Sequence, residues 1–322
     1  MAEPVALRAT TWDRGRVLDW IRDNGVYVAL AVILLYDLAF TPRFVTPHNL
    51  EVQLVLDTRI IVVALGMAMV IGTGGIDLSV GAVMALAGGL LVQFAALPAV
   101  VAILLVLAVG VLVGVLNGTL VAVFGVQPIV ATLAFLFAGR SLAELILAGK
   151  DPSVENTTVL GISSGSVLGI NGLIIAALVP IAVVAFALRR TTFGRRLLAI
   201  GDNLRAAYLS GLPVRRTLVV VYACSAALAA WAGIMDTSSI TSANALSSGL
   251  NYELFAITAV VVGGTPLTGG RVRILGTVAA AVLLQLLRST LIFHSATDAE
   301  SQMVTALVIV AAVYLQRARA RS

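Results

Sequence analysis

The sequence predicts an all-α integral membrane protein with about ten transmembrane helices, some of them broken or re-entrant. Of the 322 residues, 60% are hydrophobic and 11% are charged, and the mean hydropathy is +1.04. Soluble proteins carry roughly 25% charged residues. Many apolar runs are long enough to cross a bilayer. None alternates polar with apolar residues, as the strands of a membrane β-barrel do, so helices are expected to be the spanning elements.

The individual spans follow from a requirement of about 20 apolar residues per crossing. The ten candidates lie near residues 25–41, 58–73, 80–97, 99–121, 127–148, 168–188, 217–238, 252–264, 274–293 and 302–316. Several are short or interrupted, so eight or nine full crossings with re-entrant segments is an alternative. The expected organisation is an N-terminal tail (1–24), a transmembrane domain (25–316) and a C-terminal tail (317–322).

The N-terminal tail does not have the pattern of a cleaved signal peptide, because acidic and basic residues are mixed in it without an apolar core. Residues 11–23 could form a short interfacial helix, or the tail could be a loosely ordered basic segment. The sequence leaves both interpretations open.

Arginine residues indicate the orientation, because Lys and Arg near the ends of spans favour the cytoplasmic side. They cluster in the N-terminal tail, in the segment 189–217 after the sixth span, and in the C-terminal tail. Ten crossings would place all three clusters on one side, and the loop near 149–167 on the other. We therefore expect both termini and the segment 189–217 to be cytoplasmic.

A glycine-rich interruption separates the second and third spans. The stretch GGIDLSVG contains Gly74, Gly75, Asp77 and Ser79. The glycines can end one helix, while Asp77 or Ser79 caps the helix that begins near Leu78, where a carboxylate is favoured by the helix dipole. An ionisable residue at membrane depth can also line a translocation path, and the two roles can coexist.

A second interruption repeats the pattern G-G-x-x-L-[S/T]-x-G at residues 263–270. It contains Gly263, Gly264, Thr265 and Thr268. Gly- or Pro-interrupted spans at corresponding places in two halves indicate a transporter built from structural repeats, with the path near the breaks. The sequence does not distinguish a parallel from an inverted repeat.

These two motifs carry a resemblance to a known family. The stretches GGIDLSVGAVMALAGG and ELFAITAVVVGGTPLTGGR resemble the signature regions of sugar permeases in bacterial ABC importers, of the ribose, xylose and galactofuranose type, and the similarity runs from about Thr46 to Tyr314. The resemblance implies an ABC type II importer-like fold in the bacterial cytoplasmic (inner) membrane. Phe255 departs from the family pattern, in which an Asp is common, so no carboxylate role is transferred to it.

The arginine-rich segment 189–217 is too polar for a span and is expected to contain a short helix. Asp202 or Asn203 can cap it, Leu204 to Ser210 continue it, and Gly211 ends it. A basic loop that only fixes the orientation and touches anionic lipid is the alternative. A lone helix of this length would be marginal in water, so we expect it to dock on another surface.

The resemblance assigns this short helix to coupling with an ATPase subunit. The sequence matches the family pattern N-x-x-A-A-x-x-x-G, in which the small side chains permit close approach of a partner, although Arg205 replaces the Glu common before the alanines. Leu204 and Tyr208 share one helix face. The expected coupling residues are Gly201, Asn203, Leu204, Ala206, Ala207, Tyr208 and Gly211.

Neutral polar residues inside the spans are candidates for contact with a polar solute. With the residues of the two breaks, Asn117, Gln127 and Thr132 complete the expected translocation path. Hydrogen bonding between helices is the alternative for each of these three. Asn117 lies beside Gly114 and Gly118, which indicates a close helix crossing.

Catalytic and cofactor motifs are absent from the sequence. The only lysine, Lys150, is not part of a phosphate-binding loop, the two histidines are far apart in the sequence, and one cysteine cannot make a thiolate metal cluster. We therefore expect no enzyme activity, metal or other cofactor in this chain, and ATP and Mg²⁺ on a partner. No nucleic-acid partner is expected.

The preferred interpretation is the transmembrane permease subunit of an ABC importer for a monosaccharide such as a pentose, a hexose or galactofuranose. The resemblance implies three protein partners: a cytoplasmic ATPase subunit, an extracytoplasmic sugar-binding protein, and a second permease copy or a related permease. One alternative is an ion-coupled secondary sugar transporter that uses Asp77 or Glu144, and another is an ABC permease for a nucleoside or other small polar solute.

Overall fold

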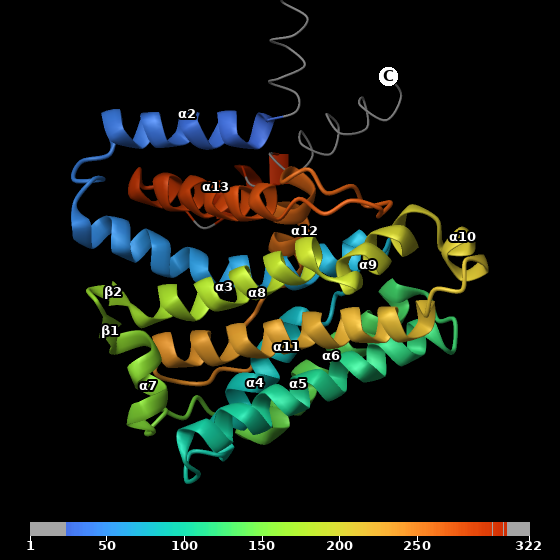
Figure 1. The fold of residues 1–322 in the computed structure, drawn as a ribbon. Coiled ribbons are helices and arrows are strands. Elements are labelled where there is room, and N and C mark those ends of the chain that lie inside the picture. The colour runs from blue at the N-terminus through green and yellow to red at the C-terminus, as the bar shows by residue number, and fades with distance from the viewer. Residues whose placement is uncertain (1–23, 298, 305, 308–322) are drawn as a thin grey trace, which may run out of the picture.

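The computed structural model describes residues 24–297, 299–304 and 306–307, and within them the chain is mostly helical (Figure 1). The helices are α2 (Gly25–Phe40), α3 (Pro47–Gly72), α4 (Val80–Gln93), α5 (Ala99–Ala122), α6 (Pro128–Leu147), α7 (Thr157–Ser164), α8 (Gly172–Arg190), α9 (Thr192–Asp202), α10 (Leu204–Leu209), α11 (Val214–Ile240), α12 (Tyr252–Val262) and α13 (Ile274–Phe293). A small antiparallel hairpin pairs β1 (Ser166–Val167) with β2 (Ile170–Asn171).

Six of the described helices are long and apolar enough to cross a membrane: α3, α5, α6, α8, α11 and α13. Three shorter apolar helices, α2, α4 and α12, correspond to further predicted spans. The predicted count of about ten helices is therefore not confirmed. Most of the tenth predicted span (302–316), the tail 317–322 and nearly all of the tail 1–24 lie outside the described residues.

Several predicted boundaries need correction. The helix predicted at 58–73 begins at Pro47, eleven residues earlier, because the polar residues Glu51 and Asp57 interrupt the apolar run without interrupting the helix. The span predicted from residue 168 begins at Gly172, because Leu168 belongs to the β-hairpin turn. α9 was not predicted as a separate helix.

The last described helix begins with a reciprocal capping box. The Thr297 amide donates to a carboxylate oxygen of Glu300 (2.7 Å), and the Glu300 amide donates to the Thr297 hydroxyl (3.2 Å). This pairing satisfies two amides that have no intrahelical acceptor. Residues 299–304 and 306–307 are helical, so the start of the tenth predicted span is described.

The core of the molecule is built on α3 and α11. The second half of α3 is buried almost completely, and α11 packs against α3, α4 and α5. On α5, Gly110, Gly114 and Gly118 lie one turn apart, and a Cβ added to any of them would collide with α11. Small residues allow such close helix packing in membranes. The predicted close crossing beside Asn117 is confirmed.

The helix bundle has two distinct ends (Figure 1). α7, β1 and β2 lie together at one end, here called the hairpin end. α9 and α10 lie at the other, here called the arginine-rich end. Asn24, just before α2, lines one surface cavity with Arg189 at the end of α8. The first described helix therefore starts at the arginine-rich end.

Candidate translocation and coupling site

The first break, between α3 and α4, is organised around the buried carboxylate of Asp77. One carboxylate oxygen accepts hydrogen bonds from the amide (3.0 Å) and the hydroxyl (2.5 Å) of Ser79. The other accepts a bond from the hydroxyl of Ser225 on α11 (2.9 Å). Asn117 on α5 donates to the Ser79 hydroxyl (3.0 Å), so the network joins the break to two helices.

The contacts of Asp77 agree only in part with the predicted capping role. Asp77 does accept the Ser79 amide, but α4 begins at Val80 rather than near Leu78, and Ser79 at the N-cap makes no side-chain capping bond. Asp77 is 1% exposed. Burying a carboxylate is costly unless it is hydrogen-bonded, and here three donors compensate that cost.

The second break, residues 263–273 between α12 and α13, is held by backbone geometry. Gly264, Gly269 and Gly270 all have positive φ (90°, 86° and 79°), which glycine adopts without a steric penalty. The hydroxyl of Thr265, which is fully buried, accepts the amide of Arg273 (3.0 Å) and closes the loop. Thr268 is exposed.

The two breaks touch each other. The Gly270 amide donates to the Gly72 carbonyl (3.0 Å), and a Cβ on Gly74 would contact the Thr268 carbonyl. The predicted pair of interruptions therefore forms one structural unit, in which the end of α3 meets the loop after α12. The sequence pattern identified both breaks, although it did not show that they meet.

Gly201 connects the segment 189–217 to the unit formed by the two breaks. It lies near the end of α9, and a Cβ at this position would collide with both the Gly72 carbonyl and the Gly270 amide. A Cβ on Gly269 would lie 3.0 Å from the Gly201 Cα. Gly201 was predicted to belong to the coupling surface, but the structure places it underneath, where α9 contacts both breaks.

The predicted short helix is confirmed as α10. The Asn203 side chain caps it by accepting the Ala206 amide (2.9 Å), and Gly211 follows it with φ of 77°. Leu204 and Tyr208 are exposed (55% and 64%), as is the neighbouring Leu209. α10 therefore presents an apolar outer face at the arginine-rich end.

The two alanines of the coupling pattern have different environments. Ala206 is exposed, whereas Ala207 is 4% exposed and packs in a small cluster with Ile200 and Val214. Ala207 therefore supports α10 from within. The expectation that its small side chain admits a partner surface does not fit this position.

The remaining predicted path residues do not converge on one cavity. Thr132 is fully buried and donates to the Pro128 carbonyl (2.9 Å), one turn earlier, and Asn117 is buried in the Asp77 network. Gln127 is exposed at the start of α6. Asn117 thus bonds to a residue outside its own helix, which agrees with the alternative interpretation, whereas the short Thr132 bond lies within α6.

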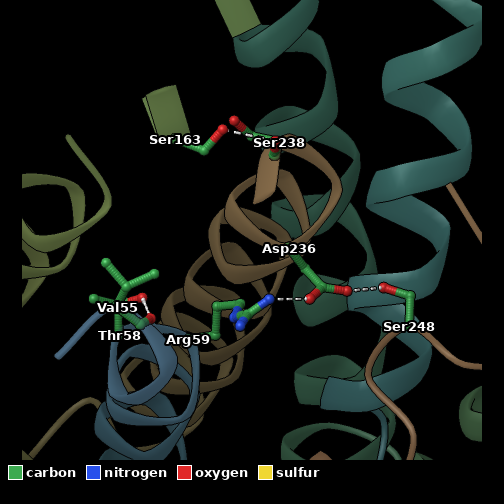
Figure 2. Close-up of polar contacts among 7 residues, drawn as sticks. All are labelled: Val55, Thr58, Arg59, Ser163, Asp236, Ser238 and Ser248. Carbon is green, nitrogen blue, oxygen red and sulfur yellow. Dashed lines mark hydrogen bonds and ion pairs between the residues drawn. The ribbon is translucent and has the colours of Figure 1, made fainter. Parts of the chain in front are cut away.

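A buried ion pair was missed by the sequence analysis. Arg59 on α3 donates to Asp236 on α11 (2.7 Å), and the second carboxylate oxygen of Asp236 accepts the hydroxyl of Ser248 (2.7 Å), as Figure 2 shows. The sequence could have indicated this pair, because a basic residue lies in one apolar run and an acidic residue lies in another. Opposite charges in spans commonly pair with each other.

The segment 241–251, which connects α11 to α12, has a second arginine anchor. Arg140 on α6 donates to the carbonyls of Ala245 (2.8 Å), Leu246 (3.1 Å) and Ser248 (3.3 Å). Arg140 thus binds this non-helical segment directly, and Arg59 is linked to it through Asp236. Among the described residues, no group of three or more His, Cys, Asp or Glu side chains could hold a metal ion.

Comparisons with known proteins agree with this architecture. A family model described as "Branched-chain amino acid transport system / permease component" matches residues 50–313. The galactofuranose transporter permease protein of Escherichia coli (strain K12) is 36% identical over 98% of this chain and 95% of its own length.

Two further relatives are import permeases. The ribose import permease protein of Escherichia coli (strain K12) is 33% identical over 91% of this chain and 93% of its own length. A fructose import permease protein of Bifidobacterium longum (strain NCC 2705) is 34% identical over 80% of this chain and 74% of its own length. No solved structure matches the chain.

Proposed function

Because the chain belongs to the family described as the permease component of branched-chain amino acid transport systems, and its relatives include sugar permeases, we propose that it is the permease subunit of an ATP-driven ABC importer for a monosaccharide. The observation that carries the proposal is the similarity to ribose and galactofuranose permeases over more than nine tenths of the chain. The substrate class is a pentose, a hexose or galactofuranose.

The proposed coupling element is the α9–α10 region. α10 offers an exposed apolar face with Leu204 and Tyr208, and such a face needs a partner when it lies in water. At the other side of this region, Gly201 contacts both breaks. A cytoplasmic ATPase that displaced the α9–α10 region would therefore act on the end of α3 and on the loop between α12 and α13 through direct backbone contacts.

The chain works as one part of an assembly in this proposal. A second permease copy or a related permease completes the translocation path, an extracytoplasmic binding protein delivers the sugar, and the ATPase subunit binds ATP and Mg²⁺. The arginine-rich end faces the cytoplasm of the bacterial inner membrane, in accordance with the positive-inside rule. The start of α2 near Arg189 supports a cytoplasmic N-terminus.

The experiment is sugar uptake by the permease reconstituted in proteoliposomes with its ATPase and binding protein. Labelled ribose, fructose, galactose and leucine are compared, with and without ATP. We expect ATP-dependent uptake of one sugar and none of leucine. Uptake that needs no ATPase and disappears when the ion gradient is collapsed would favour the secondary transporter and overturn the proposal.

A further inference from the structure

The segment Thr241–Asn251 enters the bundle from the hairpin end without forming a helix. Near its start, the Thr241 carbonyl accepts the amide of Val154 in the loop before α7 (2.9 Å). Near its other end, Gly249 packs so closely on Gly81 in the first turn of α4 that a Cβ would collide with the Gly81 carbonyl. From Gly81 to the last residue of α4, at the hairpin end, α4 rises about 18 Å. The segment therefore reaches deep into the bundle.

Side chains from the surrounding helices satisfy many of the polar groups of this segment. Arg140 binds three of its carbonyls. Asp236, which is paired with Arg59, accepts the Ser248 hydroxyl (Figure 2). Within the segment, the Asn244 side chain accepts the amides of Leu246 and Ser247 (2.9 and 2.7 Å). The segment is thus a fixed structure rather than a loose connection.

One face of the segment is nevertheless open. Leu246 and Leu250 are 63% and 53% exposed, and Ser247 is exposed between them. Irregular backbone at membrane depth is tolerated where it is buried in protein or lines a water-filled cavity, and it does not face lipid. The open face therefore borders either water or another protein surface. An exposed serine hydroxyl between two exposed leucines suits a path that a sugar crosses, because sugars combine hydroxyl groups with apolar ring faces.

We propose that Ser247 lines the sugar translocation path, and that Arg59, Asp236 and Arg140 are positioning residues that hold the segment 241–251 in place. This inference rests on the proposed function. The segment lies next to the first break through Gly249 and Gly81, so it continues the unit formed by the two breaks toward the hairpin end.

The first experiment measures the accessibility of a cysteine at position 247. In a Cys224→Ala background, Ser247→Cys is compared with Leu116→Cys, a residue that is 59% exposed on the regular helix α5. Both are treated with a charged, membrane-impermeant thiosulfonate in the complete reconstituted assembly. We expect Ser247→Cys to react at least about tenfold faster, because the reactive thiolate is disfavoured in an apolar environment. Complete modification should abolish most of the sugar uptake.

Three outcomes would overturn the assignment of Ser247. Reaction as slow as that of Leu116→Cys would place the segment against lipid. A Ser247→Cys thiol that reacts with the reagent only after the assembly is dissociated would place it in a closed protein interface. Complete modification without loss of uptake would place it in water but off the path. If the unmodified permease does not import sugar with ATP, the proposed function fails instead, so the two failures are distinguishable.

The second experiment tests the positioning role. Ser248→Ala removes the connection from Asp236 to the segment but leaves the Arg59–Asp236 ion pair intact. We expect a several-fold lower maximal uptake rate per folded permease and an altered labelling rate at Ser247→Cys. Thr158→Ala, at an exposed position of α7, is the control and should change neither quantity. A purely structural role predicts that uptake changes only in proportion to the amount of folded permease, and that result would contradict the positioning role.

Discussion

The hydroxyl oxygen of Ser225 on α11 lies 2.9 Å from a carboxylate oxygen of Asp77, which precedes it by 148 residues. Asp77 thus connects the first break to the central helix of the bundle. Tyr222, one turn before Ser225, packs against Gly75 in the same break. The first break is therefore anchored to helix α11, so a displacement of α11 would also move the break.

Asp77→Asn should be tolerated, whereas Asp77→Leu should destabilise the permease. Asn keeps an oxygen for the Ser79 donors, and its amide can donate to the Ser225 hydroxyl. Leu leaves buried donors without acceptors, at a cost of about 1–3 kcal/mol for each group. The measurement is the thermal unfolding midpoint in detergent, with uptake measured in parallel. If Asp77→Asn folds normally but does not transport, the ionised carboxylate acts in the path itself.

Gly201→Ala should impair folding or coupling, because its methyl group would collide with the Gly72 carbonyl and the Gly270 amide. Overpacking of this kind costs about 1–3 kcal/mol. Gly161→Ala is a matched control, since Gly161 is also helical and has no neighbouring atom within 4 Å of an added Cβ. Unfolding midpoints and sugar-stimulated ATP hydrolysis are compared. Equal behaviour of the two variants would show that the contact of α9 with the breaks is not tight.

Asp236→Leu should destabilise the protein by about 3–5 kcal/mol, because it leaves Arg59 as a buried charge without its partner. Replacing both residues, as Arg59→Met with Asp236→Leu, should recover most of the stability, since neither charge of the pair remains. The four proteins of this double-mutant cycle are compared by denaturant or thermal unfolding. A double variant as unstable as the sum of the single variants would mean that the two charges do not interact.

Tyr208→Ala should weaken binding of the ATPase while leaving the fold intact, because Tyr208 is 64% exposed on α10. Tyr27→Ala on α2, where the side chain is also exposed, is the control. Ala207→Trp should instead disturb the packing of α10 itself, because Ala207 is buried against Ile200 and Val214. A pull-down of the ATPase and ATP hydrolysis by the assembly are measured. Undiminished binding of Tyr208→Ala would exclude this side chain from the docking surface.

The orientation can be tested with cysteines at the two ends of the bundle. In a Cys224→Ala background, Ser210→Cys lies at the arginine-rich end, and Ser166→Cys lies in the hairpin; both positions are exposed. An impermeant thiol reagent added to intact cells should label Ser166→Cys. It should leave Ser210→Cys unmodified until the membrane is permeabilised. The reverse pattern would overturn the cytoplasmic placement of the segment 189–217.

The sequence alone predicted the membrane class and many helix boundaries. The span expected at 274–293 coincides with α13, and the spans expected at 99–121 and 127–148 agree with α5 and α6 within one residue at each end. These helices are predominantly apolar and close to the length of a single crossing, so the local signal and the requirement to cross a bilayer coincide. A cap at Asp202 or Asn203 was likewise predicted, because a cap bonds to its immediate neighbours, and the structure shows it at Asn203.

The tertiary structure decided which of the distant residues meet. Gly72, Gly201 and Gly270 converge because three chain segments pack together, and glycine spacing within any one of them does not encode that contact. The partner of Arg59 is 177 residues away, and the sequence contains several acidic residues that could have played that role. Whether Ala207 faced outward or inward depended on how α10 packs against α11. Local pattern specifies an element and its ends, whereas the packing of helices selects which of its side chains are buried, paired or left open.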